Sequence, residues 1–315
     1  MNKKYLINIL KLIIFIFCLY YVSSKIDFPN TVNALKKANL LFYSFVFIIF
    51  TIGIILSAFK WNFILNSLKI KINFKTAFLI YLKGFFLNFF LPTSIGGDSL
   101  KIILIKKINK NYSAKSAFIS VFFDRFSGLI ALLFLLLIST IFIEENIIFQ
   151  VKFFLILSII FVFLMILILL LRKKIFFLLR RFIKVKKAQK IIYKFDKLFD
   201  NLFKEKHIIL KILIISLLFH TMGIFAHYLL FISIGINIKI IFVYMMLSLS
   251  RIIDSFPISF GGIGVRESFL IYFSGIIGIN SSYILAYSLL SYTLPVFMSI
   301  FYLIFNLVKR IAFKK

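Results

Sequence analysis

Long apolar runs separated by short basic segments dominate the chain. A helix needs about 20 apolar residues to cross a bilayer core, and six stretches reach that length: 5–22, 40–59, 116–143, 150–171, 208–232 and 282–307. Lys11 interrupts the first stretch and no small-residue cleavage site follows it, so we expect a retained span rather than a signal peptide. Two more apolar stretches, 76–106 and 240–279, are each broken by a Pro–Gly motif. The pattern predicts an all-α, polytopic membrane helix bundle.

Composition narrows the class of protein. Of the 315 residues, 62% are hydrophobic and 16% charged, and the mean hydropathy is +1.07. Ordinary soluble domains are about 45–50% apolar and about 25% charged, so a soluble enzyme and a disordered chain are excluded. The single cysteine, Cys18, excludes an internal disulfide framework. The net charge of +29 would suggest nucleic acid on a soluble protein. Here the lysines lie between apolar runs, so we expect contact with anionic lipid and no nucleic-acid partner.

The positive charges also predict the orientation. Segment 172–206 carries 13 Lys and Arg against three acidic residues, a balance of +10, and should be cytoplasmic. Both basic termini and the segment 60–75 should lie on the same side. These assignments agree only if 76–106 and 240–279 are re-entrant hairpins. The first would enter the membrane from the cytoplasm and return to it, and the second would do the same from the outside. The result is six full spans plus two opposed broken hairpins. We expect one transmembrane domain over 1–315 in the cytoplasmic (plasma or inner) membrane, with 172–206 as a basic amphipathic segment on the cytoplasmic leaflet.

The two breaks share a motif. Pro-x-Ser-(Ile or Phe)-Gly-Gly begins at Pro92 and again at Pro257, 165 residues later. With opposite orientations, the match indicates an inverted repeat, and broken helices in such repeats line a cavity near the bilayer midplane. The alternative is a pair of kinks that only shape the bundle. The expected helix-break residues are Pro92, Gly96, Gly97, Pro257, Gly261, Gly262 and Gly264.

Charged residues gather at these breaks. Ionisable groups inside a bilayer are costly and usually face a bundle interior or a hydrated cavity. The pairs Asp98/Lys101 and Arg251/Asp254 are spaced i,i+3, so each can meet on one helix face. The side chains of the adjacent pairs Asp124-Arg125 and Arg266-Glu267 should diverge and need partners on other elements. Structural alternatives are helix capping by Asp98, a first-turn position of Glu267 that favours the helix dipole, and snorkelling by Asp124 and Arg125. The candidate substrate-binding residues are Asp98, Lys101, Asp124, Arg125, Arg251, Asp254, Arg266 and Glu267.

Other polar residues are weaker candidates for a functional role. Lys83, His220 and His227 lie in apolar segments, and no third ligand at metal spacing accompanies the histidines, so we expect polar packing and no metal. Lys60 and Trp61 at a span end suggest an interface anchor. The chain lacks the phosphate-loop, zinc-protease and nucleophile-elbow motifs, so we expect neither a cofactor nor an enzyme.

Three stretches, 91–101, 123–129 and 256–267, together resemble the lysylphosphatidylglycerol synthase transmembrane-region family of flippase-like integral membrane proteins. The resemblance implies a bacterial or archaeal membrane protein. In the best-understood relatives this region moves an aminoacylated phospholipid between leaflets, and a C-terminal soluble domain attaches the amino acid. This chain ends after its last span, so we expect no synthase activity. Position 101 often holds Arg in that family, whereas this chain has Lys, which pairs less well with phosphate.

These observations favour a lipid flippase-like transporter that moves a phospholipid or related polar lipid through a charged cavity between the two hairpins. Its partners would be membrane phospholipids or polyprenyl and glycolipids. One alternative is an integral-membrane glycosyltransferase-type enzyme on lipid-linked substrates, with Asp27 or Asp98 as its acidic residue. The other is a scaffold that recruits enzymes of lipid or envelope biosynthesis. The lipid, the direction and driving force of transport, and the oligomeric state stay open.

Overall fold

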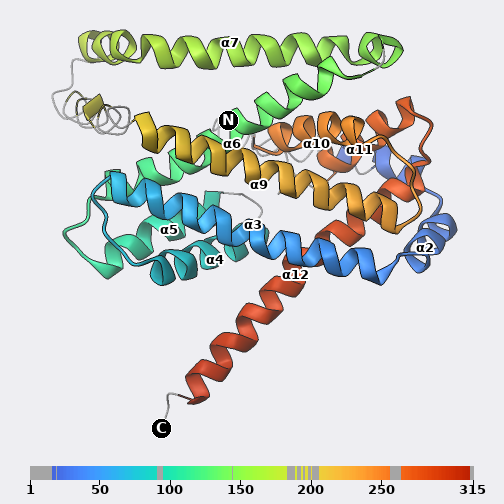
Figure 1. Ribbon diagram of the computed structural model, residues 1–315, viewed down its shortest axis with the longest axis horizontal. Helices are drawn as coiled ribbons and strands as arrows, with labels where there is room; N and C mark the ends of the chain where they lie inside the picture. The colour runs from blue at the N-terminus through green and yellow to red at the C-terminus, as the bar shows by residue number, and fades with distance from the viewer. Residues whose placement is uncertain are drawn as a thin grey trace, which may run out of the picture. The chain divides into compact units, whose positions relative to one another are not determined.

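The computed structural model describes residues 16–18, 20–90, 95–143, 145–182, 189, 193, 196–197, 200, 206–255 and 264–312. In these ranges the chain is helical and forms no strand (Figure 1), which confirms the all-α prediction. The helices are α2 (Phe28–Lys36), α3 (Leu40–Ser67), α4 (Phe74–Phe90), α5 (Ile95–Ile108), α6 (Ala114–Ile141), α7 (Glu145–Phe182), α9 (Lys206–Ser233), α10 (Ile240–Asp254), α11 (Val265–Ile276) and α12 (Ser281–Ala312).

Among the described residues, four helices are long and apolar enough to cross a membrane: α3, α6, α9 and the part of α12 over Ser281–Ile300. They correspond to four of the six expected spans. The expected span 150–171 lies within α7, and the stretch 5–22 lies mostly outside the described residues. The predicted end of the second span at residue 59 is wrong, because α3 continues to Ser67 and places Lys60 and Trp61 inside the helix.

Helix ends lie on either side of both predicted breaks. α4 ends at Phe90 before α5 begins at Ile95, and α10 ends at Asp254 before α11 begins at Val265. Of the expected break residues, Pro92, Pro257, Gly261 and Gly262 lie outside the described residues.

Gly96 and Gly97, two of the expected helix-break residues, belong to the first turn of α5. The N–H groups of a first helical turn lack partners in the helix, and the Asn88 side chain of α4 satisfies one by accepting from Gly97 N at 2.7 Å. The N-cap of α11, Gly264, has a φ of 83°, which favours glycine.

Contacts divide the chain into two compact units. Unit 1 comprises Met1–Ile54, Phe85–Gly97 and Thr221–Lys315, and unit 2 comprises Ile55–Gly84 and Asp98–His220. Helices α3 and α9 each contribute residues to both units. The expectation of a single domain stays a prediction.

The helix order extends the repeat far beyond the six-residue motif. Helices α3, α4, α5 and α6 have lengths of 28, 17, 14 and 28 residues, and α9, α10, α11 and α12 follow with 28, 15, 12 and 32. The starts of α3 and α9 are 166 residues apart, as are those of α4 and α10, and those of α6 and α12 are 167 apart. Four consecutive helices therefore recur. Their opposed orientation in a membrane stays a prediction.

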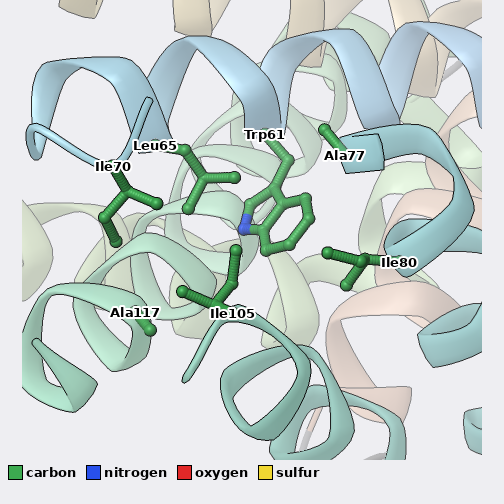
Figure 2. Packing of buried hydrophobic residues seen from close by; sticks show 7 residues of the cluster. All are labelled: Trp61, Leu65, Ile70, Ala77, Ile80, Ile105 and Ala117. Atoms are coloured by element: carbon green, nitrogen blue, oxygen red, sulfur yellow. The ribbon is translucent and has the colours of Figure 1, made fainter. Parts of the chain in front are cut away.

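The core of unit 2 is built around Trp61. Its indole is fully buried and points from α3 toward Ile80 of α4 and Ile105 of α5 (Figure 2). The indole Nε1 donates a hydrogen bond to Ser120 Oγ at 3.1 Å. The expectation that Trp61 is an interface anchor is therefore wrong, since a fully buried ring with its N–H satisfied inside the protein has no contact with the membrane surface.

Candidate functional site

Five ionisable side chains meet in unit 2. This unit 2 cluster combines three cations and two carboxylates, for a formal balance of +1, and draws on α3, α5 and α6. Four of its members are at most 9% exposed, so each must have partners inside the protein. Its members are Lys60, Asp98, Lys101, Asp124 and Arg125.

Lys60 is the most completely satisfied member. Its Nζ lies 3.0 Å from Asp124 Oδ1 and donates to the Asp124 backbone oxygen at 2.9 Å. It also donates to Ser127 Oγ at 3.3 Å and Ser216 Oγ at 3.2 Å. The sequence interpretation missed this role because it ended the span at residue 59. The apolar residues that continue at 63–65 were the available signal.

Lys101 joins the two carboxylates. Its Nζ lies 3.6 Å from Asp98 Oδ1 and 3.7 Å from Asp124 Oδ2, so the predicted i,i+3 pair with Asp98 is confirmed. The ammonium also lies 3.8 Å from the ring centroid of Tyr81, a cation–π contact that the sequence interpretation missed.

Arg125 is the accessible end of the cluster. Its Nε forms an ion pair with Asp98, and its side chain is 44% exposed. Asp124, the residue before it, is buried and bound by Lys60 and Lys101. The adjacent charges therefore do find partners on other helices, as predicted, and the snorkelling alternative is wrong for Asp124.

Glu267 anchors a second group of charges in unit 1. Its Oε2 accepts the backbone N–H of Gly264 at 2.8 Å and completes a capping box at the start of α11. Its Oε1 lies 3.2 Å from Arg266 Nε and accepts the Tyr292 hydroxyl at 2.9 Å. The structural alternative for Glu267, a role at the helix N-terminus, is thus confirmed. The expectation that adjacent Arg266 and Glu267 diverge is wrong, because the long arginine side chain folds back to the carboxylate.

Arg266 matches Lys101 in the repeat. Each lies nine residues after the proline of its motif. Arg266 stacks over the Tyr292 ring at 4.3 Å and donates to Ser291 Oγ at 3.3 Å. In each unit, the helix that follows the break thus carries a cation that contacts a tyrosine ring. The tyrosines are not at matching positions, because Tyr81 lies on α4 and Tyr292 on α12.

Arg251 and Asp254 complete the candidate residues of unit 1. They lie three residues apart on α10, yet no ion pair joins them in the described part of the chain, so their predicted pairing is not confirmed. Asp254 Oδ1 is buried without a hydrogen-bond partner among the described residues. Arg251 packs against Gly223 of α9, where an added Cβ would lie 3.3 Å from its Nη1. We name Arg251, Asp254, Arg266 and Glu267 the unit 1 cluster.

Of the two candidate histidines, His227 makes a polar packing contact and His220 packs against a glycine. His227 Nδ1 shares a 2.7 Å hydrogen bond with the Tyr287 hydroxyl, and Phe231 stacks on that tyrosine ring at 4.0 Å. His220 lies against Gly128 of α6. Over the described ranges, no three His, Cys, Asp or Glu residues gather as metal ligands would.

Comparisons with known proteins agree with the fold and the motifs. A UPF0104 membrane protein of Methanothermobacter thermautotrophicus is 21% identical over 79% of this chain and 80% of its own length. Another, from Pyrococcus horikoshii, is 25% identical over 44% of this chain and 41% of its own length, so the chain matches less than half of that relative. The family model described as "Lysylphosphatidylglycerol synthase TM region" matches residues 8–301. With its apolar spanning helices, the chain is a multi-pass membrane protein that belongs to this family.

Proposed function

We propose that the protein moves a phospholipid or related polar lipid between leaflets, and that the lipid phosphate binds at the Arg125 end of the unit 2 cluster. Membership of a lipid-related membrane family supports a role in lipid handling. The movement of lipid and the phosphate contact are the added steps of the proposal.

The observation that carries the proposal is the asymmetry of the unit 2 cluster. Lys60 and Asp124 are buried and bound on several sides, whereas the Arg125 side chain is 44% exposed. The cluster has one more cation than it has carboxylates, so an arriving phosphate finds uncompensated positive charge. A guanidinium binds phosphate with two parallel hydrogen bonds. Asp98, which already pairs with Arg125, would compete with the phosphate and keep its binding reversible.

Other parts of the proposal follow from the sequence. No nucleotide-binding motif is present in the chain, so lipid would move down its gradient or with a coupled ion. The proposed activity is transport rather than catalysis, in the cytoplasmic membrane, with both termini in the cytoplasm.

A leaflet-exchange assay tests the proposal. Purified protein is reconstituted into liposomes that contain a labelled anionic phospholipid, and a membrane-impermeant quencher reports the fraction that has crossed. Arg125→Gln removes the guanidinium and should slow exchange about 10- to 100-fold, the equivalent of one charge-assisted hydrogen-bond contact. Asp98→Asn should also change the rate. Lys37→Gln, which removes an exposed charge after α2, is the matched control and should exchange at the wild-type rate.

Two results would overturn the proposal. If Arg125→Gln exchanges lipid at the wild-type rate, Arg125 does not bind the lipid phosphate. No exchange of several headgroups by folded wild-type protein would reject transport. The same preparation incubated with polyprenyl-linked sugar donors would then show whether a new glycolipid forms.

A further inference from the structure

A basic, mostly apolar groove lies between α4 and α5 in unit 2, apart from the charged cluster. It has a volume of about 240 Å³, and four of its seven lining residues are apolar, Ile80 and Leu104 among them. Its polar lining consists of Thr76 and Lys83 of α4 and Lys107 of α5. The groove is smaller than the roughly 300–1,000 Å³ of a typical small-molecule site, so it suits a headgroup phosphate with part of an acyl chain.

The two lysines have unused positive charge. Both are exposed, and in the described part of the chain neither ammonium group has an ion pair or a hydrogen bond. Lys83 lies nine residues into α4, inside an apolar segment where an unpaired cation is costly. Lys83 and Thr76 of α4 and Lys107 of α5 line the same groove, so the two ammonium groups border one space.

We propose that this groove binds an anionic phospholipid of the surrounding leaflet, with its phosphate between Lys83 and Lys107 and its acyl chain along the apolar wall. Charge complementarity selects an anionic ligand, and the apolar lining selects one with a hydrocarbon tail, since a soluble anion would gain nothing from that surface. The hairpin end is rich in exposed lysines, which attract anionic lipid to it. These are Lys69, Lys71, Lys75 and Lys110.

Occupation of the groove would stabilise the hairpin. Ile80 lines the groove and is also part of the buried core around Trp61. Trp61 in turn lies 5.6 Å from Lys101 Nζ. A bound lipid would therefore stabilise the packing around Trp61, next to the unit 2 cluster. This would be a structural role of a resident lipid, and it does not require the protein to transport lipid.

Native mass spectrometry of the full-length protein in detergent tests the site, with phosphatidylglycerol as the anionic probe and phosphatidylcholine as the neutral one. Lys83→Gln combined with Lys107→Gln should weaken phosphatidylglycerol binding roughly 25-fold, about fivefold for each charge. Phosphatidylcholine binding should not change. Lys36→Gln combined with Lys37→Gln removes the same charge at exposed positions that do not line the groove, and it should shift binding by less than about twofold. Lys83→Arg with Lys107→Arg should retain binding and show that the fold is intact.

Equal losses of phosphatidylglycerol binding in the groove and control variants would overturn the site. The losses would then come from the general positive charge of the protein and not from a specific site. Displacement of the bound lipid by glycerol phosphate, which has no acyl chains, would overturn the lipid as occupant. The leaflet-exchange assay separates this inference from the proposed function: lipid binding that depends on Lys83 and Lys107 stands even if the wild-type protein moves no lipid.

Discussion

Lys60→Met is the sharpest test of the buried charges. Methionine nearly preserves the length of the side chain and removes the ammonium. Asp124 would keep only Lys101, at 3.7 Å, in a site where its own side chain is 7% exposed. Removing one partner of a buried ion pair costs about 3–5 kcal/mol. Ser127 and Ser216 add little to that cost, because their hydroxyls remain hydrogen-bonded to each other at 3.0 Å. We expect Lys60→Met to lower the free energy of unfolding by about 3–5 kcal/mol.

The chain offers a specific probe for this measurement. Trp61 is the only tryptophan and is fully buried in the core of unit 2. Its emission during a titration with denaturing detergent reports unfolding of that unit, with excitation at the red edge where tyrosine does not absorb. Lys75→Met makes the same chemical change at an exposed position and should stay within about 0.5 kcal/mol of wild type.

A double-mutant cycle isolates the ion pair. In an Asp124→Asn background the carboxylate is already neutral, so Lys60→Met should cost about 2–3 kcal/mol less than it does alone. An equal cost in both backgrounds would refute the reasoning, because the lysine would then act through packing. A cost below about 1 kcal/mol in the wild-type background would show that water reaches the pair.

The remaining predictions concern packing and capping, and each is read from the same detergent titration or from a thermal melt. Gly128→Ala should destabilise unit 2 by about 1–3 kcal/mol, because its Cβ would lie 2.9 Å from His220 Nε2. Gly275→Ala, with no heavy atom within 4 Å of its Cβ, should be neutral or stabilising by up to about 1 kcal/mol. Glu267→Ala should cost about 1–2 kcal/mol through loss of the Gly264 cap, whereas Glu267→Gln, which still accepts that hydrogen bond, should cost less. Equal effects of the two Glu267 substitutions would assign its role to charge rather than capping.

Apolar run lengths determined the helical class and the four spanning helices of the described residues, and motif spacing predicted the two breaks. Run length suffices for this, because a bilayer forces the backbone to satisfy its hydrogen bonds within each segment. The matching motifs at Pro92 and Pro257 also predicted a repeat that the helix order then extended to four helices. Family membership followed from the same residues.

Only the tertiary structure decided how the charges are partnered. In a sequence pattern, a charged residue interrupts an apolar run, so Lys60 marked the predicted end of a span. In the structure, Asp124 and two serines bind the Lys60 ammonium inside the helix bundle. The rotamer of Arg266 turned an expected divergence from Glu267 into a contact. Helix periodicity places a side chain on a face of its own helix, but the neighbouring helices determine whether that face meets a carboxylate, an aromatic ring or lipid.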